Sequence, residues 1–432
     1  MEKQLKIIIT GDNGECLPPP YGGIPKRCLL HAKIWRELGA KVYMQVHHKH
    51  ANENDLGARA EYFYDYAKPP TAFDKIFLVL GKFLSRPWLF TRLIFLQLRL
   101  DNEAYFGRYL YCAAKAIILD KKIKDVKPDV IVTETGGLQS LMSLEIGKRN
   151  GLPVILENYA EIQFKPDEKN ENIAGRQSKL WKYLVNGVDL VVPASKHCTK
   201  GPLKYLTDPD KMKVIYSGIN FDIFNGRALD DKPAARKKFN LPEEKFLVMA
   251  VGALKMRKGH DQLFEAILKI PKEKLKKMAV VLCGMGDIPE LRKRAEELNF
   301  PADSLFVFQG LTEEDLARLY SSVDCFCFPS ITPRECMGMA MKEAMAIGLP
   351  IVAYDTGGIS EAITPGENGL LAPTGDREAL ARGNVAMLNM PAEERKRMGQ
   401  NNIEKARKVF DIKVTAKELL DEIFKLARKD VN

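Results

Sequence analysis

Short apolar runs alternate along the chain with longer stretches in which apolar residues recur at helical spacing. The run Leu5–Thr10 is followed by an amphipathic stretch, Lys26–Leu38, which Gly39 ends before another run at 41–46. Helical and strand-like patterns that alternate in this way predict an α/β protein with parallel sheets. Further strands are expected within 128–134, 153–157, 246–252, 281–287, 325–328 and 349–361.

The length predicts two domains, because 432 residues are enough for two separate hydrophobic cores. A polar stretch around 226–238 separates two halves that share the α/β pattern. The final stretch, Lys413–Lys429, carries apolar residues at helical spacing and predicts a C-terminal helix.

Two glutamates, Glu335 and Glu343, flank a segment that follows the strand-like run Cys325–Phe328 and leads into strong helix formers. The segment is therefore expected to form a loop and a helix N-terminus. The first N–H groups of a helix favour phosphate, and Gly338 lets the backbone approach a ligand. Glu335 could accept hydrogen bonds from sugar hydroxyls and Glu343 from a ribose, because carboxylates offer only acceptors. The alternative is two ordinary surface glutamates.

A cationic loop follows the expected strand at 246–252. It carries Lys255, Arg257 and Lys258. Lysine is a common phosphate ligand, so Lys258 is a candidate binding residue, and an exposed basic loop is the alternative. The strand at 281–287 ends in a GxG turn that includes Gly284, a weak signal by itself because many α/β turns share it.

The glycine pair Gly357-Gly358 closes the last run and precedes a turn at 366–371. The lysine loop, the GxG turn, the two glutamates and this pair, in this order, resemble the donor half of the retaining glycosyltransferases with the GT-B fold (glycosyltransferase family 4, or group 1). The resemblance extends from Pro20-Tyr21-Gly22-Gly23 to about Leu371.

This resemblance implies two Rossmann-like domains that face each other across a cleft. Residues 1–224 would form the acceptor-binding domain and residues 240–410 the nucleotide-sugar donor domain, while a helix in 411–432 would cross back and pack on the first domain. The stretches 188–195 and 214–224 resemble the family's last strands before the crossing, and 306–311 resembles the segment whose backbone contacts the base.

The resemblance also implies site residues. Lys258, Glu335 and Arg257 would be catalytic, and Tyr21, Glu157 and Tyr159 would lie on the acceptor side. The donor would be bound by Gly22, Gly23, Gly252, Lys258, Gly284, Gly310, Glu335, Met337, Gly338, Met339 and Glu343.

Two positions depart from the family pattern. Ala253 stands where members commonly have an arginine, which leaves Arg257 or Lys255 as the substitute cation. Tyr159 stands where many members have a histidine near the sugar. Tyrosine can donate a hydrogen bond to a sugar hydroxyl or a phosphate, while Glu157 or the nearby Glu161 could orient the acceptor.

The activity implied by the resemblance is transfer of a hexosyl group from a UDP- or GDP-sugar to a hydroxyl of a sugar or lipid-linked acceptor, in the synthesis of a polysaccharide, glycan or glycolipid. The transfer would retain configuration by same-face attack and would need no metal or cofactor. A catalytically silent GT-B scaffold or binding protein and a nucleotide-sugar epimerase are the alternatives. A nicotinamide dehydrogenase is set aside, because no GxGxxG follows the first strand.

Residues 73–100 combine large apolar side chains with Lys82, Arg86, Arg92 and Arg99, which interrupt any run of membrane-spanning length. They predict either an in-plane helix or hairpin on an anionic membrane surface or a helical pair buried in the core. The net charge of +10 and the pI near 9.0 do not choose between phosphate-bearing ligands, membranes and nucleic acid. The cysteines without metal-type spacing, and the opening Met1-Glu2-Lys3-Gln4 with neither a basic region nor a long apolar stretch, lead us to expect a reduced, cytoplasmic protein. It would be peripheral on the inner face of the cell membrane if the first interpretation holds, and we expect no nucleic-acid partner.

A metal site is not expected. His47, His48 and His50 follow the second strand, but no acidic partner completes a ligand set, which favours a loop or acceptor contact. The eight cysteines have no CxxC or zinc-type spacing.

Overall fold

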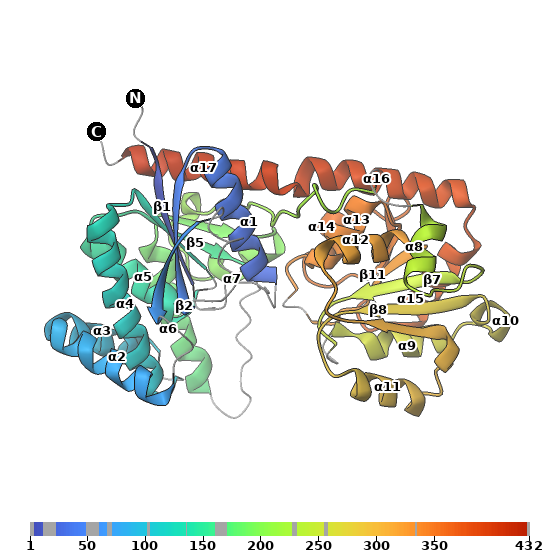
Figure 1. Cartoon of the computed structure of the whole chain (residues 1–432), viewed down its shortest axis with the longest axis horizontal. Helices are drawn as coiled ribbons and strands as arrows, with labels where there is room; N and C mark the ends of the chain where they lie inside the picture. Colours follow the sequence, from blue (N-terminus) through green and yellow to red (C-terminus); the bar gives the residue numbers. More distant parts are fainter. Residues whose placement is uncertain are drawn as a thin grey trace. The chain divides into compact units, whose positions relative to one another are not determined.

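The computed structural model describes residues 4–11, 23–48, 60–66, 71–101, 104–134, 136–159, 171–226, 231–254, 258–332 and 335–429. The chain divides into two units, here called unit 1 (Met1–Ser217 with Ile412–Asn432) and unit 2 (Gly218–Asp411). Each unit contains a parallel six-stranded sheet with helices on both faces (Figure 1). The predicted α/β fold with two Rossmann-like sheets is confirmed.

The sheet of unit 1 has the order β3-β2-β1-β4-β5-β6. Its central strands are apolar on both faces, as expected when helices cover a parallel sheet. The register pairs Ile8 with Tyr43 on one side and with Ile131 on the other. The strands are β1 (Lys6–Gly11), β2 (Lys41–His48), β3 (Glu61–Tyr66), β4 (Val130–Glu134), β5 (Val154–Asn158) and β6 (Leu190–Pro193).

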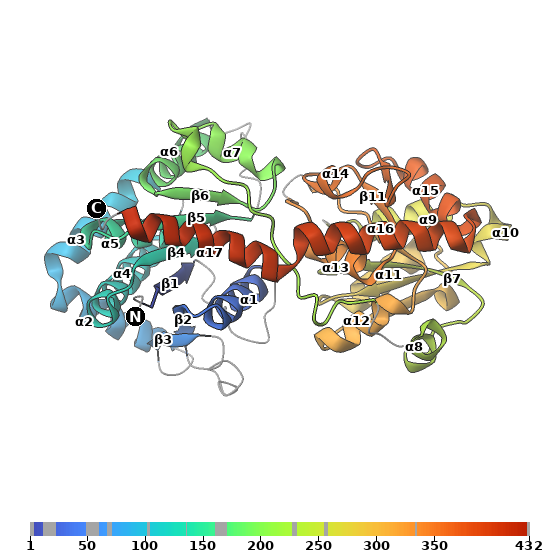
Figure 2. The same ribbon diagram turned by 90° about the horizontal axis from the view of Figure 1, so that it is seen from above.

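Helices α1 (Gly23–Glu37) and α17 (Ile412–Lys429) pack together on one face of this sheet (Figure 2). Trp35 Nε1 donates to the carbonyl of Ala416 across 2.8 Å, so the predicted C-terminal helix contacts the first helix of the chain. The other face is covered by α4 (Phe106–Val126), α5 (Leu138–Arg149) and α6 (Glu171–Gly187). The remaining helices are α2 (Ala72–Ser85), α3 (Pro87–Leu100) and the short α7 (Lys200–Leu203).

The sheet of unit 2 has the order β12-β11-β10-β7-β8-β9. One face carries α9 (His260–Leu268), α11 (Ile288–Glu297) and α15 (Arg377–Asn389), and the other α12 (Glu313–Ser321), α13 (Met339–Ile347) and α16 (Ala392–Phe410) (Figure 1). The strands are β7 (Phe246–Val251), β8 (Met278–Cys283), β9 (Leu305–Phe308), β10 (Cys325–Phe328), β11 (Ile351–Tyr354) and β12 (Gly369–Ala372). The short helices are α8 (Lys232–Lys238), α10 (Lys272–Leu275) and α14 (Ile359–Ala362).

Three elements differ from the sequence prediction. The stretch 214–224 forms no strand, and its Ile219 makes only an isolated bridge to Asp411. The polar stretch at 226–238 contains helix α8, whose first turn is capped by Asp231. Strand β3 was not predicted, because its alternating charged and aromatic residues belong to an edge strand and lack an apolar run.

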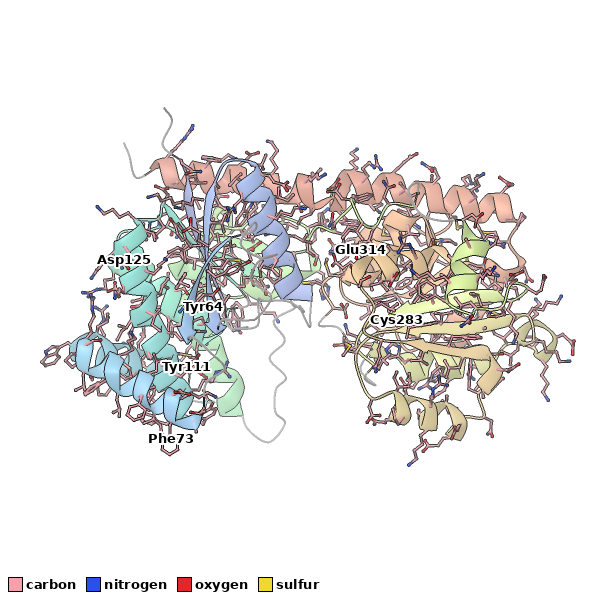
Figure 3. All side chains as sticks on the ribbon, in the orientation of Figure 1. Tyr64, Phe73, Tyr111, Asp125, Cys283 and Glu314 are labelled. Carbon is pink, nitrogen blue, oxygen red and sulfur yellow. The ribbon has the colours of Figure 1, made fainter. Side chains whose placement is uncertain are left out.

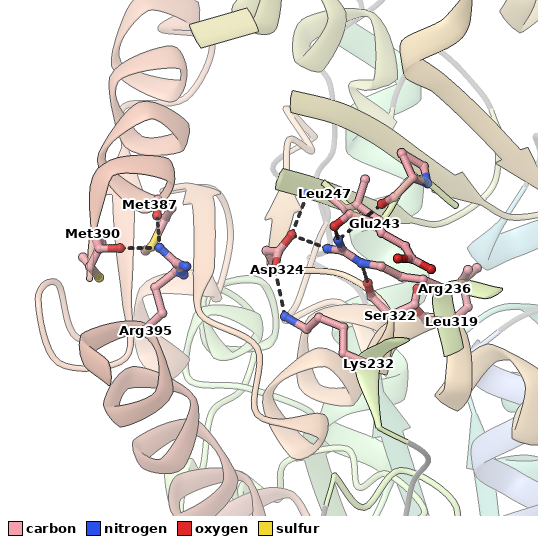
Figure 4. A network of polar contacts seen from close by, with 11 residues as sticks. Lys232, Arg236, Glu243, Leu247, Leu319, Ser322, Asp324, Met387, Met390 and Arg395 are labelled. Atoms are coloured by element: carbon pink, nitrogen blue, oxygen red, sulfur yellow. Dashed lines mark hydrogen bonds and ion pairs between the residues drawn. The ribbon is translucent and has the colours of Figure 1, made fainter. Parts of the chain in front are cut away.

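Asp324, just before β10, ties α8 to the sheet of unit 2 (Figure 4). Its carboxylate accepts hydrogen bonds from Lys232 Nζ at 2.8 Å, from Arg236 Nη2 at 2.7 Å and from the Leu247 backbone N–H at 2.7 Å. Arg236 is buried and also donates to the carbonyl of Ser322 across 2.9 Å. This network ties α8 to the amino ends of the central strands β7 and β10, opposite the carboxyl ends that carry the candidate site.

Candidate functional site

Lys258 and Glu335 meet in unit 2. Lys258 lies between β7 and α9, and Glu335 lies between β10 and α13. Lys258 Nζ donates to Glu335 Oε2 across 2.7 Å, and Ser330 Oγ lies 3.5 Å from the same oxygen. The two side chains keep 23% and 13% of their surface exposed. The pair is therefore open to solvent, and a ligand phosphate could replace the carboxylate on Lys258.

The glycine pair after β11 holds the loop of Glu335. The N–H of Gly358 donates to the carbonyl of Glu335 across 3.2 Å. Gly357 has a φ of +63°, and a Cβ at this position would lie 1.8 Å from the same carbonyl oxygen. Only glycine fits both the left-handed backbone and this close approach. The glycine pair therefore positions Glu335.

The loop after β7 and the GxG turn after β8 lie side by side and are joined by backbone hydrogen bonds. The N–H of Gly252 donates to the carbonyl of Cys283 at 3.0 Å, and that of Leu254 donates to Met285 at 2.9 Å. A Cβ on Gly284 would lie 1.8 Å from the carbonyl oxygen of Gly252. Any larger residue at position 284 would have to push the two loops apart.

Helix α13 points its first turn toward the loop that carries Glu335. Gly338 precedes the helix, and among the described residues no side chain caps its first N–H groups. These N–H groups and the helix dipole suit an anion. Met337 is buried, and Gly338 and Met339 are half-buried. Gly310, which follows β9, is exposed and has a φ of +70°.

Glu343 is buried in unit 2, with 4% of its surface exposed. The hydroxyl of Tyr320 on α12 donates to Glu343 Oε2 across 3.1 Å. Burial, followed by the charge of Glu343, raises the pKa of Tyr320 well above its usual value and that of Cys283 to about 12. Figure 3 labels Cys283, which ends β8. The interpretation of Glu343 as a solvated surface residue is therefore wrong.

Sequence reasoning did not single out two residues that support this region, Tyr320 and His260. His260 is buried at the start of α9, and its Nε2 lies 3.1 Å from the carbonyl of Ala253. Burial lowers the pKa of His260, so the neutral ring donates to this carbonyl. The position of His260 directly after Gly259 in the cationic loop was the available signal, whereas nothing in the pattern of α12 marks Tyr320.

Several predicted residues lie outside the described residues. Arg257 and Lys255, the two substitutes for the missing arginine, are among them, as are Tyr21 and Gly22. Gly23 is the first residue of α1. The described residues contain no group of three or more His, Cys, Asp or Glu side chains suited to a metal ion. Of the three histidines near the end of β2, His50 is outside the described residues.

A buried polar cluster lies at the carboxyl ends of β4 and β5 in unit 1. Arg27 Nη2 donates to Glu157 Oε1 across 2.6 Å, and the Tyr159 hydroxyl donates to Glu157 Oε2 across 2.5 Å. The guanidinium of Arg27 also stacks 4.0 Å from the centre of the Tyr159 ring. Tyr159 further lies 3.4 Å from Oε1 of Glu134, while His31 Nδ1 is 3.7 Å from Glu157. Glu157 is 1% exposed.

Burial and ion pairing together set the protonation states in this cluster. Burial favours the neutral form of Glu157, but the charge of Arg27 outweighs it and lowers the pKa of Glu157 to about 2. Burial lowers the pKa of His31 and raises that of Tyr159. At neutral pH the cluster thus holds an ionised Arg27–Glu157 pair beside a neutral histidine and a neutral tyrosine. Of the predicted acceptor-side residues, Tyr159 is only partly buried.

Comparison with known proteins relates unit 2 to a protein family. Residues 231–405, nearly all of unit 2, match the glycosyl transferases group 1 family. The D-inositol 3-phosphate glycosyltransferase of Corynebacterium efficiens is 28% identical over 278 residues, which are 62% of this chain and 62% of that protein. The chain thus spans about three fifths of the length of the curated relatives that it matches, 62% and 63% for two Corynebacterium proteins.

Solved structures share the fold across both units. The sucrose-phosphate synthase of Thermosynechococcus elongatus superposes with a TM-score of 0.75 at 20% identity, covering 98% of this chain and 99% of that one. Anabaena HepE in complex with UDP gives a TM-score of 0.73 at 16% identity, covering 98% and 100%. Residues 231–405 therefore belong to the glycosyl transferases group 1 family, and the chain has the GT-B fold.

Proposed function

We propose that the chain is a retaining glycosyltransferase that moves a hexosyl group from a nucleoside diphosphate sugar to a hydroxyl acceptor. The observation that carries this proposal is the solvent-accessible Lys258–Glu335 pair of 2.7 Å. It lies on the loops that adjoin the first turn of α13. A cation, a carboxylate and the first N–H groups of a helix match the pyrophosphate and sugar hydroxyls of such a donor.

In this proposal Lys258 binds the donor pyrophosphate and Glu335 accepts hydrogen bonds from the sugar. Glu343, fixed by Tyr320, faces the ribose. The bond between the anomeric carbon and the phosphate oxygen breaks while the acceptor oxygen bonds to the same face of that carbon. The departing phosphate takes the proton of the acceptor hydroxyl. Lys258 and the N-terminus of α13 stabilise the negative charge on the phosphate, which is often the largest catalytic contribution.

The donor is proposed to be a UDP-sugar, with a GDP-sugar as the alternative, because Anabaena HepE, of the same fold, was crystallised with UDP and with UDP-glucose. The acceptor is proposed to be a sugar or lipid-linked hydroxyl in polysaccharide, glycan or glycolipid synthesis. Tyr159, partly buried beside Arg27, is the proposed acceptor-side contact. Because Lys258 and the N-terminus of α13 are proposed to stabilise the charge of the departing phosphate without a metal ion, we expect turnover to continue when EDTA is present.

The test is a thermal-shift screen with UDP-, GDP-, ADP- and TDP-sugars, followed by a transfer assay in which NMR identifies the product anomer. We expect one donor to raise the Tm of wild-type protein and of Lys269→Ala. Lys269 is the matched control, since it forms an exposed pair with Glu378 at 3.4 Å in the same unit. Lys258→Ala should lose the shift, and its kcat should fall about 100-fold or more.

Three other outcomes would change the assignment. Selective donor binding without transfer to any acceptor, and without hydrolysis, would favour a silent binding protein. An equal response of Lys258→Ala and Lys269→Ala would remove the proposed donor site. Release of a product with inverted anomeric configuration would contradict the retaining mechanism.

A further inference from the structure

Helices α2 and α3 form a hairpin on the outer edge of unit 1, next to α4 and α6 (Figure 1). Helix α3 buries Phe90, Leu93 and Ile94 in the core, whereas α2 has no buried residue. Helix α3 therefore fits the interpretation as a helix of the core, whereas α2 does not. The described residues contain no helix that is long and apolar enough to cross a membrane.

Helix α2 turns an apolar stripe away from the core. Phe73, Phe77, Leu80 and Leu84 follow one another at helical spacing, so they share one face. They are between 50% and 75% exposed. Figure 3 shows Phe73, the second residue of α2, projecting away from the ribbon. An amphipathic helix normally buries its apolar face. The exposed stripe therefore indicates that α2 contacts an apolar surface outside this chain.

Helix α3 has an exposed stripe of a different composition. Trp88, Arg92, Phe95 and Arg99 recur at helical spacing on the face opposite its buried residues. Trp88 is 89% exposed and Phe95 is 68% exposed. Aromatic rings that alternate with arginines suit the boundary between lipid tails and anionic headgroups, because each side chain has a partner there.

A cationic groove runs beside α3. One hollow of about 670 Å³ is lined by Arg99, Lys148, Lys179 and Lys182, and a second of about 240 Å³ is lined by Arg92, Lys148 and Arg149. Glu145 in the second hollow accepts a hydrogen bond from Tyr183 at 2.6 Å and lies 3.8 Å from Arg92. Cations therefore dominate the groove next to the apolar stripes.

We propose that the α2–α3 hairpin docks this protein on an anionic phospholipid bilayer, with the two stripes at the lipid interface and the cationic groove against headgroup phosphates. The sequence of residues 71–100 contains five basic residues, Lys75, Lys82, Arg86, Arg92 and Arg99, and one acidic residue, Asp74. Arg86 is paired with Asp120 on α4, which leaves four of the five cations for headgroups. A second copy of the chain is a poorer occupant, because a two-fold contact would place Arg92 and Arg99 against the same cationic patch. The bilayer supplies both hydrocarbon and negative charge.

The first test is sedimentation of the full chain with phosphatidylcholine vesicles with and without phosphatidylglycerol, at low and high salt. We expect binding only to the anionic vesicles and weaker binding at high salt. Phe77→Ser/Trp88→Ser/Phe95→Ser should abolish it. Leu38→Ser/Leu203→Ser/Val414→Ser, which replaces three exposed apolar residues of unit 1 outside the hairpin, should bind as wild type. Arg92→Gln should lower partitioning about fivefold, and Lys417→Gln on α17 should leave it unchanged.

The second test reads insertion directly through Trp88. Of the three tryptophans, Trp35 is fully buried, Trp181 is partly buried against the core of unit 1, and Trp88 is highly exposed. Brominated acyl chains should therefore quench part of the wild-type fluorescence, and Trp88→Phe should lose that quenching while it still sediments. No binding to anionic vesicles at low salt, or equal binding of the hairpin variant, would overturn the proposal. If wild-type protein is a dimer and the hairpin variant is a monomer, the stripes bind a second copy of the chain instead. Neither test needs a nucleotide sugar.

Discussion

The hydroxyl of Tyr320 on α12 donates a hydrogen bond to Oε2 of Glu343 on α13 across 3.1 Å. Both side chains are buried, and the tyrosine hydroxyl also lies 3.1 Å from the carbonyl of Ala340. The bond fixes the carboxylate that is proposed to face the donor ribose. It joins two neighbouring helices on one face of the sheet in unit 2, so stability and donor affinity should depend on it together.

Tyr320→Phe should lower the free energy of unfolding by about 2 kcal/mol, because a buried carboxylate loses a hydrogen bond. Urea unfolding measures this change, and donor titration should show a raised Kd. The matched control is Tyr354→Phe in the same unit. The Tyr354 hydroxyl is buried and makes no hydrogen bond to the residues described, so its removal should cost almost nothing. Equal losses in both variants would contradict the role of the Tyr320 bond.

Gly284→Ala should destabilise unit 2 by about 2 kcal/mol and weaken donor binding. Its Cβ would lie 1.8 Å from the carbonyl oxygen of Gly252, so the lysine loop must move. Gly81→Ala is the contrasting substitution. Gly81 lies within α2 with open space around it, and alanine there should stabilise the helix by up to about 1 kcal/mol. Differential scanning calorimetry of the two variants should show Tm shifts of opposite sign.

Acid should destabilise unit 1 through Glu157. The folded-state pKa of Glu157 is lowered from 4.5 to about 2, so its contribution is complete above pH 4.5 and is lost as the pH falls toward 2. That contribution is on the order of 3 kcal/mol. His31, held neutral by burial, adds to the loss, because acid favours its protonated form in the unfolded chain. Urea unfolding at several pH values measures the slope.

Glu157→Gln tests this assignment. The variant should be less stable than wild type at neutral pH, since Arg27 keeps its charge without the carboxylate. Its stability should also depend less on pH in the acid range. A slope equal to that of wild type would show that another group carries the acid transition.

Asp324→Asn should lower the stability of unit 2 by about 3 kcal/mol, because two cations and a backbone N–H lose a charged acceptor. The control is Asp303→Asn. Asp303 is 79% exposed and lies 3.5 Å from Lys245, so its removal should change the free energy of unfolding by less than about 0.5 kcal/mol. Chemical denaturation measures the free energy of unfolding of both variants. Similar losses in the two would show that Asp324 does not stabilise the amino ends of β7 and β10.

Local sequence carried most of the fold prediction. The expected strands at 246–252, 325–328 and 349–361 appear as β7, β10 and β11, because a parallel strand covered on both faces reads as a plain apolar run. The prediction failed at 214–224, where an apolar run packs without strand partners apart from one bridge. It also missed the edge strand β3.

The sequence by itself determined the strand–loop–helix arrangement around Glu335 and the glycine positions that shape it, because backbone conformation and helix starts depend on neighbours a few residues away. Tertiary structure alone decided that Glu343 is buried against Tyr320, that Glu157 pairs with Arg27, and that α2 turns its apolar stripe to solvent. The reason is that the surroundings of a side chain are set by elements distant in sequence, and a periodic pattern shows that a face is apolar without showing what that face contacts.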